Sequence, residues 1–128
     1  LVLISCTTIQ SKGDAERVPT NCAANVNFEM ETNKAKLTTF KCYIQPFSGK
    51  EVLWYEFGLK NVSEKPARFV VRVIPEEGPS FSGLIPATGK PKDFPVMGPG
   101  EEQVNKFAMN TIVKIPRRLI VIVEEDLK

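Results

Sequence analysis

Histidine is absent from this 128-residue chain, and its absence limits the chemistry that the other side chains can do. Without an imidazole there is no Ser-His or Cys-His nucleophilic site, no histidine-ligated zinc and no histidine-dependent copper centre. Adjacent carboxylates do occur, but neighbouring residues of a strand point to opposite faces, so none of these runs forms an acid–base pair by itself. We therefore expect no catalytic residue and no cofactor, and we expect most of these carboxylates to be solvated turn residues. The runs are Glu76-Glu77, Glu101-Glu102 and Glu124-Glu125-Asp126.

Sulfur is the remaining soft ligand, supplied by three cysteines and three methionines. Met30, Met97 and Met109 could join a cysteine around copper, but their places in alternating strand patterns favour ordinary core filling. The net charge of +2, from 17 basic and 15 acidic residues, is far from the basic excess typical of nucleic-acid-binding proteins. The sequence predicts neither a metal site nor a nucleic-acid partner.

Cys6 ends a short apolar segment, Leu3-Ile4-Ser5-Cys6, in which two branched residues and a small residue precede the thiol. The segment resembles the lipobox of bacterial lipoproteins, whose cysteine is lipidated after a signal peptide is removed. The resemblance implies a signal-peptide remnant at residues 1–5, a palmitate-type anchor on Cys6 and a flexible tether over residues 6–21. Thr7 departs from the aspartate that retains such proteins at an inner membrane, so an outer-membrane address is expected. The alternative is that Leu1–Ser5 form a short first β-strand.

Cys22 and Cys42 are the cysteines that remain once Cys6 is assigned to lipid. Paired, they close a loop of about 20 residues, and such a crosslink stabilises a fold by roughly 3 kcal/mol, mostly by restricting the unfolded chain. The alternative is a pair of reduced, buried thiols in a cytosolic protein. We expect the disulfide, across or beside a hairpin formed by the first two strands.

Apolar and polar residues alternate at period two from residue 24 onwards, which is the pattern of strands with one buried face. No segment carries helical periodicity. The run Leu119-Ile120-Val121-Ile122-Val123 is apolar on both faces, which indicates an interior strand covered on both sides or a dimer edge. We expect one all-β domain over residues 22–128, a sandwich of about seven mainly antiparallel strands. The clearest strands are 24–31, 36–45, 51–61, 67–74, 101–110 and 117–125.

Two turn segments carry a second resemblance. Phe57-Gly58-Leu59-Lys60-Asn61-Val62-Ser63-Glu64-Lys65-Pro66 is followed, after an apolar strand, by Gly98-Pro99-Gly100-Glu101-Glu102. Bacterial immunoglobulin-like domains similarly read x-N-x-S-x-x-P after a middle strand and P-G-E before a late one. The resemblance covers about residues 51–125 and implies an immunoglobulin-like sandwich, without implying an activity. Asn61-Val62-Ser63 also matches a glycosylation acceptor, which the bacterial lipobox makes an accidental match.

Residues 76–100 interrupt the strand rhythm, because proline this dense prevents a central strand. A long loop that carries apolar side chains is often functional, and the alternative is an edge strand at Ser80–Ile85 with a loop that caps the core. Trp54 adds a second candidate, since it falls on the face opposite Leu53 and Tyr55, where an exposed indole would be an interface anchor. The possible partner-binding residues are Trp54, Phe81, Leu84, Ile85, Phe94 and Met97.

These features together predict a non-catalytic, membrane-anchored lipoprotein of the cell envelope that acts as a binding or assembly module. Its contact with another envelope protein would be made by the loop at residues 76–100 or by an exposed strand edge. The alternative is an inhibitor or accessory subunit that inserts this loop into the cleft of a partner.

Overall fold

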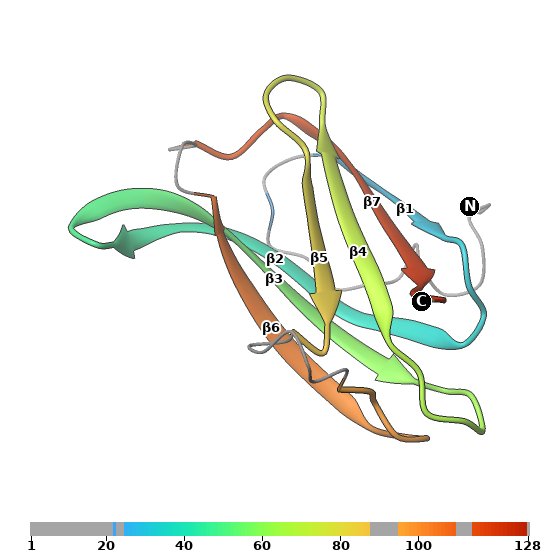
Figure 1. Cartoon of the computed structure of the whole chain (residues 1–128). Coiled ribbons are helices and arrows are strands. Elements are labelled where there is room, and N and C mark those ends of the chain that lie inside the picture. The colour runs from blue at the N-terminus through green and yellow to red at the C-terminus, as the bar shows by residue number, and fades with distance from the viewer. Residues whose placement is uncertain (1–21, 23–24, 88–94, 110–113, 128) are drawn as a thin grey trace, which may run out of the picture.

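The computed structural model describes residue 22 and residues 25–87, 95–109 and 114–127. This part of the chain is all-β, with seven strands and no helix, as the alternation predicted (Figure 1). The strands are β1 (Asn25–Met30), β2 (Ala35–Phe47), β3 (Lys50–Asn61), β4 (Phe69–Pro75), β5 (Phe81–Ile85), β6 (Glu102–Met109) and β7 (Arg118–Glu125).

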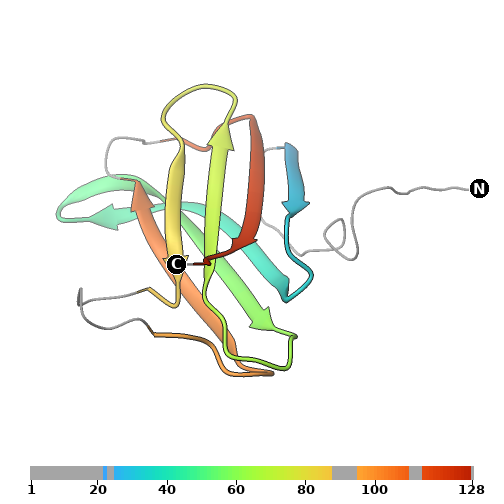
Figure 2. The same ribbon diagram turned by 45° about the vertical axis from the view of Figure 1, so that its right-hand side comes forward.

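The strands form two sheets, a four-stranded one in the order β1-β7-β4-β5 and a three-stranded one in the order β2-β3-β6 (Figure 2). Every pairing is antiparallel except that of β1 with β7, which is parallel. The prediction of mainly antiparallel strands is confirmed. A constant-type immunoglobulin domain also divides seven strands into four and three, but its four-stranded sheet holds the second strand where this chain places the seventh.

The expected hairpin between the first two strands is wrong. β1 pairs with β7 in the four-stranded sheet, and β2 pairs with β3 in the other. The connection between β1 and β2 crosses from one sheet to the other. At its start Glu31 donates its N–H to the carbonyl of Val123 in β7, and at its end Lys34 accepts from the N–H of Val62, which follows β3. Alternation specifies which side of a strand is buried, but it does not specify which strand pairs with it.

One core lies between the two sheets and is built by the inward residues of both. The central strand of the three-stranded sheet contributes the largest buried side chains, and Phe40 contacts both Tyr55 and Phe57 with ring centroids 5.9 and 5.1 Å apart. Aromatic pairs at this spacing add to the free energy of burial. Side chains with 0% exposure include Phe40, Leu53, Tyr55, Phe57, Leu59, Phe69, Val71, Val73 and Val123.

The disulfide between Cys22 and Cys42 is confirmed, with an S–S distance of 1.94 Å and a Cα–Cα distance of 4.8 Å. Cys22 precedes β1 and Cys42 lies in β2, so the bond joins the two sheets and does not brace a hairpin. Cys42 is 2% exposed and belongs to the core. The crosslink therefore restrains the separation of the sheets as well as the unfolded chain.

Asn61 joins the two turn segments that the sequence singled out. Its side chain is fully buried, and Nδ2 donates to the carbonyls of Lys65 and Met97 at 2.9 and 2.8 Å. Oδ1 accepts from the backbone N–H and the hydroxyl of Ser63, and the Asn61 carbonyl accepts from the N–H of Gly100. The amide is thus occupied and shielded, so Asn61 acts as a turn clamp and does not offer a glycosylation site in the folded protein.

Arg68 and Asp126 form the most buried ion pair that the structure describes. Their side chains are 8% and 9% exposed, with Nη2 and Oδ2 at 2.8 Å, and Nε also donates to the same carboxylate oxygen. The Asp126 N–H donates to the carbonyl of Arg68 at 2.7 Å. Side chain and backbone together fasten the residue after β7 to the residue before β4.

Candidate functional site: the projecting β2–β3 hairpin

The hairpin of β2 and β3 extends beyond the rest of the fold (Figure 1). The two strands pair from Ala35 opposite Asn61 to Phe47 opposite Lys50, whereas the described pairing of β3 with β6 runs between Leu53 and Lys60. Ser48 and Gly49 form the turn, with φ angles of 53° and 80°. Positive φ at both turn residues is the geometry that matches the natural twist of a two-residue hairpin. The tip is therefore ordered by its own backbone ladder and stands clear of the sheet's third strand.

An aromatic pair occupies the outer face of this tip. Phe47 and Trp54 stack edge to face, with ring centroids 5.6 Å apart and planes at 81°. Phe47 is 41% exposed, and the Trp54 Nε1–H donates to the carbonyl of Gln45 at 3.3 Å, which fixes the indole over the hairpin. Trp54 is half-buried on the face opposite the core, as the alternation predicted. An aromatic pair held in place in this way can contact a partner with little loss of side-chain freedom.

Tyr43 continues the aromatic surface towards the body, because it lies opposite Trp54 in the register of β2 and β3. Its hydroxyl donates to Glu56 Oε1 at 2.9 Å. Burial, then the hydrogen bond to Glu56, then the charge of that carboxylate raise the pKa of Tyr43 to about 12. The phenol is therefore a neutral donor at physiological pH, and this contact orients both side chains.

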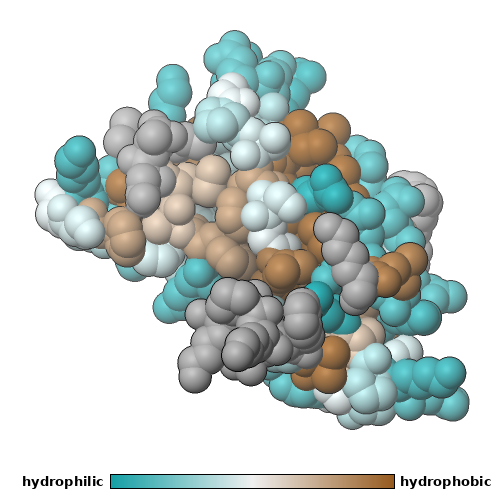
Figure 3. Space-filling model, in the orientation of Figure 1, coloured by the Kyte–Doolittle hydropathy of each residue, from teal (hydrophilic) through white to brown (hydrophobic). Residues whose placement is uncertain are grey.

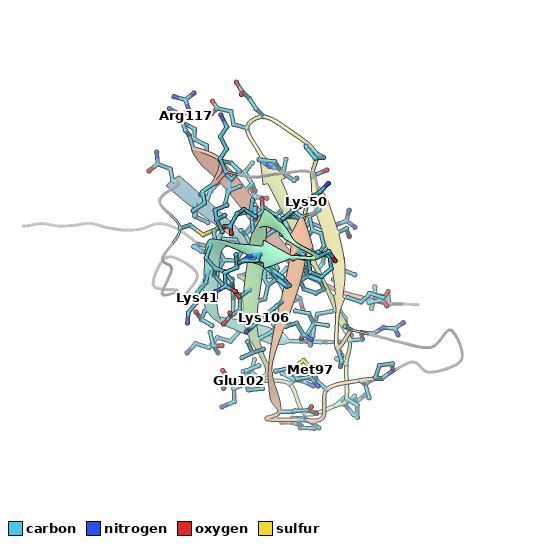
Figure 4. The ribbon with its side chains drawn as sticks, turned by 90° about the vertical axis from the view of Figure 1, so that its left-hand side faces the viewer. Lys41, Lys50, Met97, Glu102, Lys106 and Arg117 are labelled. Atoms are coloured by element: carbon cyan, nitrogen blue, oxygen red, sulfur yellow. A yellow bond between two sulfur atoms is a disulfide. The ribbon has the colours of Figure 1, made fainter. Side chains whose placement is uncertain are left out.

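Beyond Tyr43 the same face becomes charged. Glu56 lies opposite Lys41 on one neighbour and Lys106 on the other, and Lys41 Nζ is 4.0 Å from Glu56 Oε2. Figure 4 shows Lys41 and Lys106 on the same side of the three-stranded sheet. Cross-strand pairs of opposite charge stabilise such a face modestly. The outer face thus changes from aromatic at the tip to charged over the body.

The candidates in residues 76–100 do not form one surface. Ile85 and Met97 are 0% exposed, and Met97 forms a β-bridge with Ala67, so these two residues are corrected from partner-binding candidates to core residues. β5 is an edge strand, and the segment around Met97 caps the core, which is the alternative that the proline content left open. Apolar residues in this loop lie within reach of the core, and burial is where they gain most free energy.

Phe81 and Leu84 point to opposite sides of β5. Phe81 is half-buried against Phe57 and Phe107, with its ring centroid 4.8 Å from that of Phe107. Leu84 lies on the outer side of β5, across from Val70. Phe94 falls outside the described residues. A partner-binding role for Phe81, Leu84 and Phe94 stays a prediction.

The carboxylate runs are more engaged than the sequence suggested. Glu124 accepts from Arg72 Nε, Glu125 lies 3.0 Å from Lys34 Nζ, and Glu76 lies 3.5 Å from Arg117. Glu101 accepts from the N–H of Gly98 and from Gln103, and these hydrogen bonds, the one from Gln103 first, lower its pKa. Glu76 and Glu101 are exposed residues outside the strands, as expected, and their contacts add a cation or an N–H to solvated carboxylates. Glu124 differs, because it lies in β7 and pairs with Arg72 of the neighbouring β4.

Phe47 is the residue of the aromatic pair that the sequence analysis missed. The strand was expected to end at Gln45, because Pro46 normally marks a strand end, but β2 continues to Phe47. Pro46 is tolerated there because β2 is an edge strand, which leaves one side of the ladder unpaired. The sequence feature that could have identified Phe47 is its position two residues after Gln45 and directly before Ser48-Gly49. This spacing extends the alternating strand pattern up to a turn dipeptide.

No group of three or more histidine, cysteine, aspartate or glutamate residues that could hold a metal ion occurs in the described part of the chain. The same residues include no helix long and apolar enough to cross a membrane. Comparison with known proteins found no matching protein family, no matching curated protein and no matching solved structure, so arguments about function rest on this chain's own residues.

Proposed function

We propose that this chain is a non-catalytic, lipid-anchored protein of the cell envelope whose immunoglobulin-like sandwich binds another envelope protein through the tip of the β2–β3 hairpin. The observation that carries the binding role is the edge-to-face pair of Phe47 and Trp54 on a projecting, ordered tip. Aromatic side chains are over-represented among the residues that dominate binding energy, and a rigid scaffold lowers the entropy lost on binding.

The lipid anchor in this proposal rests on Cys6 and the lipobox-like residues before it. The disulfide between Cys22 and Cys42 supports an oxidising compartment, where such bonds persist. Three acyl chains hold a protein far more firmly than one, since each buried methylene contributes about 0.8 kcal/mol. An outer-membrane site follows from Thr7, which replaces the retention aspartate.

Incorporation of a radioactive fatty acid tests the anchor. Cells expressing the wild-type protein should label it, and cells expressing Cys6→Ala should not. A matched control is Cys42→Ala, which breaks the disulfide with Cys22 and leaves Cys6 in place; it should still incorporate the label. Label that persists in Cys6→Ala would contradict the anchor and leave the binding role to be judged separately.

Site-specific photocrosslinking tests the binding surface. A photoreactive phenylalanine analogue at position 47 should give one discrete adduct in envelope fractions, because this side chain is the exposed half of the aromatic pair. The matched control position is Val62, which is 48% exposed in a turn outside the hairpin tip. Trp54→Ala should reduce the adduct from position 47. An adduct of equal yield from both positions, or one insensitive to Trp54→Ala, would refute the hairpin as the contact surface.

The alternative role, insertion of the 76–100 loop into a partner's cleft, has less support. Ile85 and Met97 are core residues, so they cannot enter another protein without opening this one.

A further inference from the structure

The outer face of the four-stranded sheet has an apolar centre. β7 lies between β1 and β4, with its odd-numbered residues in the core. On the other side of the same strand, Ile120 and Ile122 are only half-buried, and Ile74 of β4, which lies opposite Ile120, is 40% exposed. The strand that was expected to be covered on both sides is therefore interior in its sheet but open on its outer side.

The apolar centre extends across several strands. Val70 of β4 lies opposite Leu84 of β5, and both are half-buried on this side. Figure 3 shows the hydrophobic side chains gathered over β4 and β7. A hollow of about 400 Å³ lies at one end of the face, with Ile74, Ile120 and Arg118 among its lining residues. Arg72 lies on the same side of β4, opposite Ile122, and separates Val70 and Leu84 from Ile74 and Ile120. An apolar surface with polar residues among and around it is typical of an interaction site.

Along β7, residues of opposite charge lie at the two ends of this face. The outward residues of the strand read Arg118, Ile120, Ile122 and Glu124 in order, and Glu124 also pairs with Arg72 of β4 on the same face. A two-fold axis that lies between two such faces and runs across the strands reverses the order in the second copy. Each Arg118 then meets a Glu124, and each Ile120 meets an Ile122. A parallel arrangement would instead put like charges together, which costs free energy.

We propose that two copies of this chain associate face to face through the outer side of the β1-β7-β4-β5 sheet, with β7 antiparallel to β7 of the second copy. The order of residues along β7 is self-complementary, as a two-fold interface requires, and Arg118 of the second copy would join the existing pair of Arg72 and Glu124. This inference is independent of the hairpin and of the lipid anchor.

The size of the face sets the expected strength. Four strands about 4.8 Å apart and roughly six residues long present on the order of 400 Å² per copy. Stable complexes bury about 800 Å² per partner, so the dimer is a weak, concentration-dependent one. We expect a dissociation constant between about 10 μM and 1 mM.

Charge exchange on β7 tests the geometry. The full chain is used, with Cys6→Ser in every sample to prevent crosslinking through that thiol, and association is measured by sedimentation equilibrium. Arg118→Glu alone and Glu124→Arg alone should each weaken self-association at least about tenfold, because each variant carries like charges at both ends of the strand. An equimolar mixture of the two variants should recover the wild-type affinity, because each cationic end then meets an anionic one.

Lys106→Glu is the matched control, since it makes the same charge change on the outer face of the other sheet. It should leave the dissociation constant within about twofold of wild type, and circular dichroism should show that all the variants are folded. A wild-type protein that remains monomeric at about 1 mM would overturn the proposal. A mixture no stronger than the separate variants would overturn it as well, because restoration is specific to the antiparallel arrangement.

Discussion

The two sheets share one core but have different outer faces. The three-stranded sheet carries an aromatic pair at its projecting tip and a charged ladder of Lys41, Glu56 and Lys106 over its body. The four-stranded sheet carries isoleucines at its centre, and the most buried ion pair that the structure describes, Arg68 with Asp126, lies at its end. The difference shows that one alternating pattern builds both inner faces, while the outer positions are free to become two separate contact surfaces.

The largest expected difference in stability is between two variants that each remove one member of an ion pair, one pair from each sheet. Arg68→Ala should lower the free energy of unfolding by about 3–5 kcal/mol, because the buried Asp126 loses the guanidinium that contacts it at 2.8 Å. Lys41→Ala, on a side chain that is 48% exposed, should cost less than about 1 kcal/mol. Urea denaturation measures both. Equal losses would show that burial does not distinguish the two sheets' charges.

Loss of the disulfide is expected to have the next largest effect on the free energy of unfolding. Replacing both Cys22 and Cys42 with serine should cost roughly 3 kcal/mol, because the unfolded chain regains the freedom that the loop closure removed. The measurement is thermal unfolding of the double variant beside wild type. Arg68→Ala combined with the double variant should give additive losses, since the two features lie at different positions in the fold. A cost near zero would mean that the core alone holds the sheets together.

Two tyrosines of adjacent strands, Tyr55 on the inner face and Tyr43 on the outer face, should differ in their effect on stability by a smaller amount. Tyr55 is 0% exposed, and no residue in the described part of the chain hydrogen-bonds its hydroxyl. Tyr55→Phe should therefore raise the free energy of unfolding by about 1 kcal/mol, because an unsatisfied buried hydroxyl is removed. Tyr43→Phe should lower it by about 1 kcal/mol, because the hydrogen bond to Glu56 is lost. Effects of the same sign would contradict this assignment.

The smallest expected effect is a loss of stability in strong base. Folding raises the pKa of Tyr43 from 10.0 to about 12, so the folded state holds its phenolic proton more tightly than the unfolded state does. Its contribution is fully present below pH 10 and declines as the pH rises towards 12. Unfolding free energies measured at increasing alkaline pH should fall less steeply in Tyr43→Phe than in wild type. An unchanged slope would show that Tyr43 does not contribute.

The sequence predicted the inward residues and most strand boundaries correctly. In β3 the residues Leu53, Tyr55, Phe57 and Leu59 are all fully buried, as their spacing required. The pairing of β1 was missed, because a six-residue strand with one apolar face can join either sheet. Met97 was expected both as a core methionine and as a partner-binding candidate, and the first expectation is the one that holds. Its contacts with Ala67 and Asn61, thirty and thirty-six residues away in the chain, were not visible in the sequence.

The candidate surface was predicted in part. Trp54 was identified by its place opposite Leu53 and Tyr55, whereas Phe47 depended on where β2 ended and on the turn that follows. The sequence showed that the centre of β7 is apolar on both faces, but it did not show that the outer face is left partly exposed. Only the packed sheets show that Ile120 and Ile122 remain half-buried.

The amino-acid sequence alone determined the all-β class, the absence of histidine chemistry and the faces that turn inward, because these depend on residue type and period-two spacing. Tertiary structure decided which strands became neighbours, that the disulfide spans two sheets, and that Asn61 closes two distant turns. Those outcomes depend on contacts between segments far apart in the chain, and their free energies appear only when the two sheets pack against each other.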